Sequence, residues 1–237
     1  MTDDFLPVLP VSVVELGAQG KRPPGGHDTK SSRSAYSGFP EEAVELAYSL
    51  FLRESRIIYD PFAGWGERGA GAYRYARTYL GNDTSTAAVE ANRKLGVGIT
   101  LADARYIPAP YHDGLFTCPP YWNLERYEAD GGLDRLATWP GFLSALAGVW
   151  SRAIPAMKAG GTAVVVVGDW RKDGRYYDLT YRTERALESA GMVPFDKVVL
   201  SRRTVTKIKI MLPQAKRLGY TVRCHETMLV YRKPVDP

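Results

Sequence analysis

The chain has 237 residues, which is enough for one large domain or two small ones. Its 45% apolar and 24% charged content is that of a globular protein and excludes a wholly disordered or fibrous chain. A formal net charge of +5 is compatible with a nucleic-acid partner but does not require one.

Signals for targeting and cross-linking are weak throughout the sequence. No apolar run approaches the roughly 20 residues of a membrane span. The opening residues Met-Thr-Asp-Asp do not lead into a basic and then apolar leader. Cys118 and Cys224 are far apart and lack metal-ligand spacing. We therefore expect a cytoplasmic protein with no disulfide framework, no metal and no membrane contact.

The first 35 residues predict a mobile arm, because residues 17–38 are rich in glycine, proline and serine and show no apolar period. Helical and strand patterns then alternate along the chain. A helix opens at Phe39-Pro40-Glu41-Glu42, where one proline and two acids suit a helix start. Further helices are expected over 67–76, 85–94, 140–158 and 179–190, and strands over 56–60, 78–82, 98–102, 114–117, 162–167, 193–200 and 226–231.

This alternation predicts one α/β domain over residues 36–237, with a mostly parallel seven-stranded sheet and helices on both faces. The apolar, β-branched run from Thr162 to Val167 is typical of a strand that is buried on both faces. In folds of this kind, ligands bind at the carboxyl ends of the strands.

A glycine-rich turn, Asp60-Pro61-Phe62-Ala63-Gly64-Trp65-Gly66, follows the first of these strands. Glycines there let the backbone approach a ligand, and the next helix offers free N–H groups to an anion. The spacing lacks the third glycine of the dinucleotide fingerprint, so a tight turn without any ligand is an equal alternative.

Two acids end the next two predicted strands. Asp83 lies about 20 residues beyond the glycines, where a carboxylate can accept hydrogen bonds from ribose hydroxyls. Capping of the helix that begins near Ser85 is its structural alternative. Asp103, in Leu-Ala-Asp-Ala-Arg, could accept a hydrogen bond from an adenine amino group. Together with Asp60, these acids indicate a nucleoside site.

The strand over 114–117 runs into Cys118-Pro119-Pro120-Tyr121-Trp122. Two consecutive prolines fix the backbone and remove two N–H donors, which leaves carbonyl oxygens in a rigid turn beside an aromatic ring. Such an edge suits a planar base that carries an exocyclic amino group.

The order D-P-F-x-G-x-G, acid, acid, x-P-P-Y resembles the S-adenosylmethionine-dependent DNA amino-methyltransferases, which modify N6 of adenine or N4 of cytosine. Phe39-Pro40-Glu41-Glu42 is similar to the motif that precedes the glycine loop in members with this motif order. The segments 166–171 and 223–231 resemble later strands of phage-type members. The resemblance covers about residues 36 to 233 and implies a Rossmann-like methyltransferase fold.

The resemblance also implies a role for each matched residue. The methionine part of the cofactor would be held by Asp60, Phe62, Gly64 and Gly66, with Phe39 nearby. Asp83 would bind its ribose and Asp103 its adenine. Cys118 and the Pro119 carbonyl would face the target amino group, Pro120 would hold the turn, and Tyr121 would stack on a base flipped out of the duplex.

Cys118 departs from the family pattern, which has Asp, Asn or Ser at this position. A thiol is a weak hydrogen-bonding group, and cysteine is nearly isosteric with the serine that the family uses mainly for cytosine, so N4-cytosine is slightly favoured over N6-adenine. A nucleophilic Cys118 and a merely buried Cys118 are the alternatives. An RNA methyltransferase and a catalytically silent nucleic-acid-binding protein also remain open.

Two short loops, 123–136 and 201–223, are expected to recognise duplex DNA, which a monomer or a homodimer would bind. The second loop is basic and contains no acid. We expect part of this loop to pack on the sheet while its charges face out, because its basic residues alternate with Val205, Ile208, Ile210, Met211 and Leu212. The predicted nucleic-acid contacts are Trp122, Arg202, Arg203, Lys207 and Lys209. A solvated basic surface without a partner is the alternative.

Overall fold

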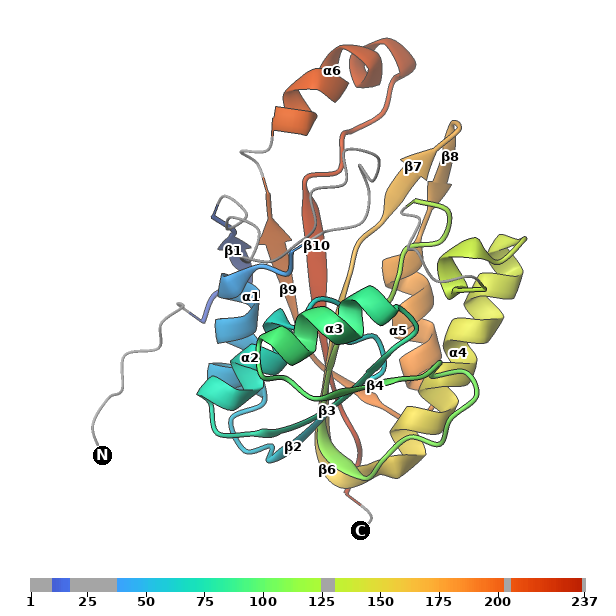
Figure 1. The fold of residues 1–237 in the computed structure, drawn as a ribbon. Helices are drawn as coiled ribbons and strands as arrows, with labels where there is room; N and C mark the ends of the chain where they lie inside the picture. The colour runs from blue at the N-terminus through green and yellow to red at the C-terminus, as the bar shows by residue number, and fades with distance from the viewer. Residues whose placement is uncertain (1–9, 18–37, 125–130, 203–205, 236–237) are drawn as a thin grey trace.

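The computed structural model describes residues 10–17, 38–124, 131–202 and 206–235. Its centre is an eight-stranded sheet in the order β1-β9-β10-β6-β5-β2-β3-β4 (Figure 1). β10 is antiparallel to both of its neighbours, and the other neighbouring strands run parallel. The strands of this sheet are β1 (Val13–Glu15), β2 (Ile57–Asp60), β3 (Thr78–Asp83), β4 (Ile99–Leu101), β5 (His112–Thr117), β6 (Met157–Val167), β9 (Val193–Ser201) and β10 (His225–Arg232).

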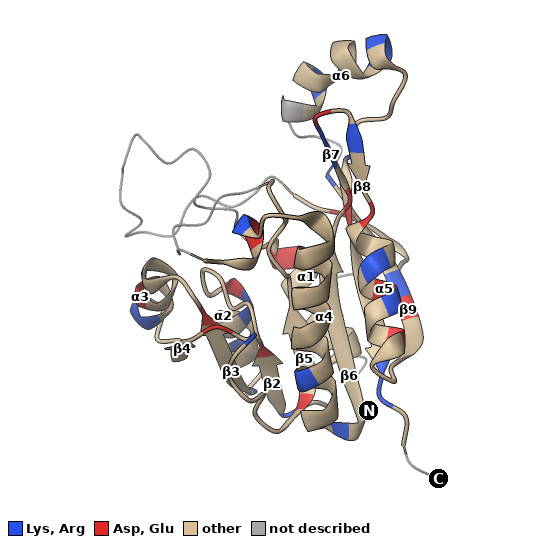
Figure 2. Ribbon diagram, turned by 90° about the vertical axis from the view of Figure 1, so that its right-hand side faces the viewer, with Lys and Arg blue, Asp and Glu red and all other residues tan. Residues whose placement is uncertain are grey.

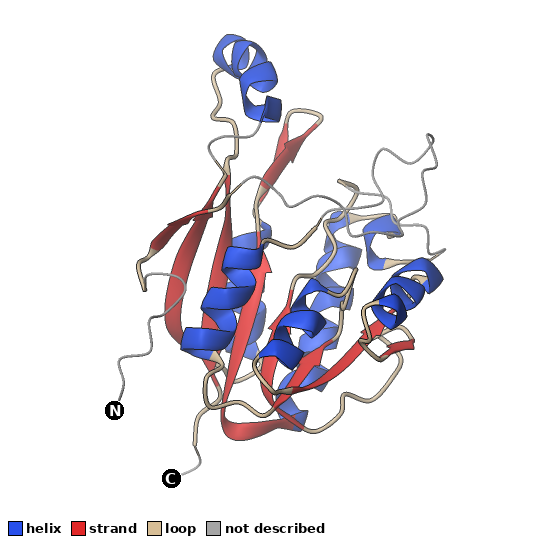
Figure 3. Ribbon diagram, turned by 60° about the vertical axis from the view of Figure 1, so that its left-hand side comes forward, coloured by secondary structure: helices blue, strands red, loops and turns tan. Residues whose placement is uncertain are grey.

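Helices cover both faces of the sheet (Figure 3). α1 (Glu41–Leu46) continues into a π-helical turn, Ala47–Phe51, and its first turn carries the two predicted acids. The other helices are α2 (Glu67–Arg74), α3 (Thr86–Lys94), α4 (Trp139–Ala156), α5 (Leu179–Ser189), α6 (Thr206–Leu218) and a short 3₁₀ turn at Leu133–Arg135. The predicted α/β sheet with helices on both faces is therefore confirmed.

β6 carries the centre of the core because its side chains are buried on both faces. Ala163, Val165 and Val167 join the cluster under α4 and α5, whereas Val164 and Val166 join the cluster under α1 and α2. Alternate residues of a strand point to opposite faces, so one apolar run holds both helical layers.

All seven predicted strands are present, and the main sheet differs from the prediction in two details. An eighth strand, β1, pairs with Val199–Ser201 of β9, a contact between distant segments that no local pattern indicates. β6 starts at Met157 rather than Thr162, because α4 ends at Ala156 and the chain enters the strand directly. Gly160 therefore lies inside β6, where its φ of 77° suits glycine.

A two-stranded hairpin and a helix extend the domain on the side where the parallel strands have their carboxyl ends. β7 (Trp170–Lys172) and β8 (Arg175–Tyr177) form a separate hairpin, and α6 stands away from the sheet (Figure 1). The expectation that part of 201–223 packs on the sheet is wrong for Ile210 and Leu212 of α6, which are 73% and 52% exposed. Successive helical residues are rotated by about 100°, so three apolar residues in a row, 210–212, cannot all face the sheet.

None of the described helices combines the length and the apolar character that crossing a membrane requires.

Candidate functional site

A cleft lies at the carboxyl ends of β2, β3, β4 and β5. The chain passes from β2 to β3 and β4 on one side, then returns to β5 on the other side of β2. Open α/β sheets bind ligands at such a reversal of strand order. The cleft is lined by these predicted residues: Phe39, Phe62, Gly64, Asp83, Asp103, Cys118, Pro119, Pro120, Tyr121 and Arg202.

Asp60 lies beneath the cleft and does not line it. Its carboxylate is fully buried and accepts hydrogen bonds from Arg68 Nε (2.7 Å) and Tyr79 Oη (2.7 Å). It also accepts bonds from Thr117 Oγ1 (2.6 Å) and the Phe62 amide (3.0 Å). Direct contact between Asp60 and a ligand, as the sequence suggested, is not supported; the residue links the ends of β2 and β5 to Tyr79 near the beginning of β3.

The Arg68 guanidinium extends this buried network to the cleft wall. It donates to the Phe62 carbonyl (2.6 Å) and lies 4.8 Å from the centroid of the Phe39 ring. Burial opposes its charge, but the Asp60 carboxylate raises the pKa of Arg68, so the guanidinium stays charged. The sequence analysis did not identify Arg68.

The two glycines of the turn have different roles. Gly64 has a φ of 59° and lines the cleft, where its N–H and C=O are both bonded. Gly66 has a φ of 105° and caps α2, and a Cβ there would lie 2.9 Å from Asn92 Oδ1. Gly66 is therefore required for the close approach of α3 to the turn rather than for lining the cleft.

Asp83 joins two loops at the edge of the cleft. Its Oδ2 accepts the Gly64 N–H and its Oδ1 accepts the Ser85 N–H, both at 2.9 Å. Burial raises the pKa of Asp83, and the two backbone hydrogen bonds oppose this rise. Ser85, and not Asp83, caps α3 by accepting the Ala88 N–H. A carboxylate oxygen has more than one lone pair, so Asp83 can also accept from a ligand.

Asp103 is oriented by Arg105. The guanidinium donates to both carboxylate oxygens, with Nη2–Oδ2 at 2.6 Å, and also to the Gly131 carbonyl. The Asp103 side chain is partly exposed to the cleft, so its orientation is fixed while acceptor capacity remains.

The turn after β5 begins where Thr117 is anchored to Asp60. It brings Cys118, Pro119, Pro120 and Tyr121 into the cleft. The Tyr121 ring meets Trp170 edge-on, with centroids 5.5 Å apart, and its hydroxyl donates to Glu226 Oε1 at 3.0 Å. The position of Tyr121 is therefore fixed at both its ring and its hydroxyl.

Glu226 is a cleft residue that the sequence analysis missed. Arg202 donates to Glu226 Oε2 from Nη2 (2.8 Å) and from Nε (3.1 Å). Gly168 leaves room for this arrangement, since a Cβ there would lie 3.3 Å from Glu226 Cγ and 3.4 Å from the Tyr121 hydroxyl. The available signal was an acid at the start of an otherwise apolar strand, because the beginning of an antiparallel strand lies beside the carboxyl ends of parallel ones.

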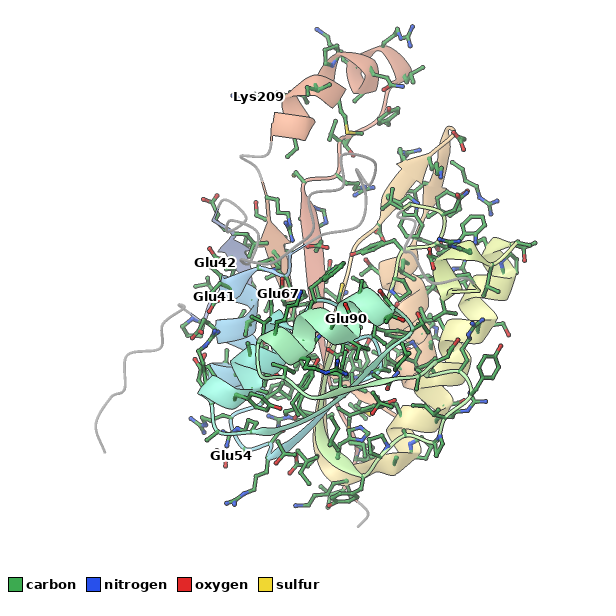
Figure 4. All side chains as sticks on the ribbon, viewed as in Figure 1. Glu41, Glu42, Glu54, Glu67, Glu90 and Lys209 are labelled. Carbon is green, nitrogen blue, oxygen red and sulfur yellow. The ribbon has the colours of Figure 1, made fainter. Side chains whose placement is uncertain are left out.

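The predicted nucleic-acid contacts are dispersed. Trp122 lies outside the cleft, its Nε1 donates to the Leu136 carbonyl (2.7 Å), and its ring packs on Tyr177 and Trp139. Stacking of Trp122 on a base is therefore not supported. Arg202 lines the cleft but is paired with Glu226. Lys209 is exposed on α6, apart from the cleft (Figure 4). Arg203 and the Lys207 side chain are outside the described residues.

No three His, Cys, Asp or Glu side chains are grouped as metal ligands in the part of the chain that the structure describes.

The chain has the Rossmann-like methyltransferase fold. The [4+2]-cyclase SpnF superposes with a TM-score of 0.59 at 17% identity, over 86% of this chain and 85% of that one. TrmN from Thermus thermophilus gives 0.56 at 16% identity, over 82% of this chain and 49% of TrmN. A putative RNA methyltransferase from Pyrococcus horikoshii gives 0.52 at 15% identity, over 83% and 86%.

These comparisons define the fold alone. The chain spans about half the length of TrmN, and the similar structures include a cyclase, so fold does not fix the reaction. No protein-family model and no curated protein sequence matches this chain.

Proposed function

We propose that the cleft binds S-adenosylmethionine and that the protein transfers its methyl group to the exocyclic amino group of a base in DNA. The main support is that the Asp83-bound glycine turn and the Cys118-Pro119-Pro120-Tyr121 turn line the same cleft. The first offers oriented acceptors to a nucleoside, and the second offers a rigid carbonyl edge and an aromatic ring to a base.

The residues around Gly64 fit S-adenosylmethionine. The left-handed backbone of Gly64 lets a ligand approach closely, and Asp83 has acceptor capacity left for ribose hydroxyls. Asp103 would accept from the adenine amino group, and Phe39 and Phe62 provide apolar surface beside them. When bound, the cofactor supplies a methyl group on a positively charged sulfur, which is the electrophile.

At the other end of the cleft, the protein orients the base. The Pro119 carbonyl and Cys118 would accept hydrogen bonds from the amino group, and Tyr121 would stack on the ring. Fixing the amino hydrogens aims the nitrogen lone pair, so catalysis rests on positioning and requires no covalent enzyme intermediate. The base must first leave the duplex, and stacking offsets part of that cost.

Cytosine N4 is the favoured target and adenine N6 the second, because Cys118 resembles serine in size. RNA is a second candidate substrate, since a putative RNA methyltransferase is among the structures that share this fold.

The decisive experiment incubates the protein with isotopically labelled S-adenosylmethionine and, in parallel, duplex DNA, single-stranded DNA and RNA. Mass spectrometry of the digested nucleosides then identifies the methylated base. N4-methylcytosine or N6-methyladenine from DNA supports the proposal, whereas methylation confined to RNA supports the second candidate. Absence of cofactor binding in calorimetry refutes both.

Two variants test the proposed base site. Tyr121→Ala should strongly reduce methyl transfer while cofactor affinity stays close to that of the parent. Cys118→Ser should stay active if Cys118 only forms a hydrogen bond. A covalent adduct between Cys118 and a fluorinated cytosine would show instead that the thiol acts as a nucleophile.

A further inference from the structure

The β7–β8 hairpin has one buried and one exposed side. Trp170 pairs with Tyr177 and Arg171 with Tyr176 across the two strands. Trp170 and Tyr177 are 5% and 8% exposed and stack with centroids 5.1 Å apart. Because side chains alternate along a strand, Arg171 and Tyr176 project together from the opposite side.

On that exposed side, four side chains alternate as cation and ring. The Arg171 guanidinium lies 5.3 Å from the Tyr176 centroid and 5.2 Å from the Tyr220 centroid. The Arg223 guanidinium lies 4.7 Å from the Tyr176 centroid. Tyr220, Arg171, Tyr176 and Arg223 thus form a continuous stack, here called the Arg–Tyr ladder, from the hairpin and the segment between α6 and β10.

The two guanidiniums of the ladder keep their hydrogen-bonding edges unused. Both side chains are exposed, and within the described residues neither forms an ion pair or a side-chain hydrogen bond. Stacking occupies only the faces of a guanidinium, so its in-plane N–H donors remain available. Asp169, an acid in contact with the ladder, accepts hydrogen bonds from the Tyr176 hydroxyl and the Thr180 amide.

The other charges around the hairpin leave it cationic. Lys172 and Arg175 lie on the strands, and Arg175 is 5.3 Å from the Tyr177 ring. Asp173 occupies the exposed hairpin tip, and Asp178 is paired with Arg182 at 3.1 Å. Figure 2 shows Lys and Arg on the hairpin, on α6 and on the chain leading into β10, all at one end of the molecule.

The ladder is connected to the proposed base site by short contacts. Trp170, beside Arg171, supports the Tyr121 ring. Lys172 Nζ donates to the carbonyl and to Oδ1 of Asn123, two residues after Tyr121. On the other side, Cys224, next to Arg223, accepts the amide N–H of the cleft residue Arg202 (2.6 Å). The ladder is therefore held in a fixed position beside the cleft.

We propose that the Arg–Tyr ladder binds the sugar–phosphate backbone of the polynucleotide strand whose base enters the cleft, an assignment that rests on the proposed function. Planar guanidiniums with free edges match phosphate oxygens in pairs, and stacking holds these edges in place before the ligand arrives. Tyr220 is the terminal ring of the ladder, and its outer face offers stacking surface to a base next to the target. This surface, rather than Arg202 or α6, is the grip on the nucleic acid.

The test measures binding of a fluorescent oligonucleotide of mixed sequence by anisotropy across a series of salt concentrations. Duplex DNA, single-stranded DNA and RNA form separate arms, because all three carry the same backbone chemistry. The variant is Arg171→Gln/Arg223→Gln. The matched control is Arg56→Gln/Arg152→Gln, which removes the same charge from exposed side chains just before β2 and in the last turns of α4, at the end of the sheet opposite the ladder.

The ladder variant should bind about tenfold more weakly than its parent in the arm that contains the true ligand, and its log–log salt slope should fall by about 2 units. The control should bind nearly as the parent does. Equal losses in both variants, parental affinity of the ladder variant, or no binding by the parent in any arm would overturn the proposal.

Calorimetry with S-adenosylhomocysteine on the same preparations separates the two proposals. If the parent binds no cofactor but the ladder variant loses oligonucleotide binding, the proposed function is refuted and the role of the ladder still stands. If the protein binds the cofactor and transfers the methyl group, but the ladder variant binds the oligonucleotide as tightly as the parent, only the proposed role of the ladder is refuted.

Discussion

Four donors converge on the Asp60 carboxylate, and one of them, Arg68, is itself buried. A buried ion pair adds little net stability, but breaking it leaves an uncompensated charge in the interior. Asp60 therefore matters for the architecture of the cleft, because it connects three strands and, through Arg68, the Phe39 ring.

Asp60→Asn should lower the free energy of unfolding by about 3–5 kcal/mol, since Arg68 would remain buried without a counter-charge. Urea denaturation measures the change. Asp196→Asn is the matched control, because Asp196 is exposed and its substitution should cost less than about 0.5 kcal/mol. Similar stability of the two variants would contradict the assigned role of Asp60.

Asp83→Ala should weaken S-adenosylmethionine binding by about 1–3 kcal/mol, because the ribose hydroxyls would lose a charged acceptor. Burial raises the pKa of Asp83, so the affinity of the parent should fall as the pH drops through that raised pKa. Calorimetry at several pH values measures both effects. Unchanged affinity in a folded Asp83→Ala protein would remove Asp83 from the site.

At the level of elements, the sequence predicted those whose pattern is local. β6 was recognisable because an uninterrupted apolar run is typical of a strand buried on both faces. Asp83 ends β3 and Asp103 follows β4, and both line the cleft because the carboxyl ends of neighbouring parallel strands meet at one edge of the sheet. β1 was missed, since three residues give no period and its partner β9 is distant in the chain. Glu226 was missed because it lies at the beginning of β10, an antiparallel strand, whereas the cleft was expected only at the carboxyl ends of strands.

α6 shows a different limit of sequence reasoning. Its β-branched residues and internal Pro213 disfavour a helix locally, yet the segment is helical and exposes Ile210, Met211 and Leu212. The roles of Asp60 and Gly66 were misjudged for a related reason. Both belong to the glycine motif, but burial decides which motif residues face a ligand and which hold the turn in place.

Ile210→Ser/Leu212→Ser should change the free energy of unfolding by less than about 0.5 kcal/mol, because both side chains are mostly exposed. Urea denaturation of the variant and the parent measures this. Leu200→Ser on β9, where the side chain is fully buried, is the matched control and should be strongly destabilising. A large loss in the α6 variant would show that α6 packs on the rest of the protein.

For the whole molecule, stability against acid depends on His112. The residue is fully buried, its Nδ1 is bonded to the Pro110 carbonyl, and burial lowers its pKa below the ordinary 6.5. The unfolded chain therefore takes up a proton more readily than the folded protein. It follows that stability falls as the pH drops through 6.5, until the lower pKa of folded His112 is reached.

His112→Gln should reduce this pH dependence. Urea denaturation at pH about 7.5 and about 5.5 gives the loss of unfolding free energy for the parent and the variant, and the comparison concerns the loss rather than the absolute stability. A smaller loss in the variant is expected. An equal loss would assign the acid sensitivity to other groups.

The position of β10 between β9 and β6 has a consequence for biosynthesis. The sheet cannot be completed between β9 and β6 until β10, the last of the described elements in the chain, has been synthesised. Until residues 225–232 leave the ribosome, β6 presents an unpaired, valine-rich edge from Ala163 to Val167. Such an edge is a template for pairing with other chains. We expect nascent chains stalled between β6 and β10 to aggregate, so that chaperone protection is needed most while residues 168–224 are being synthesised.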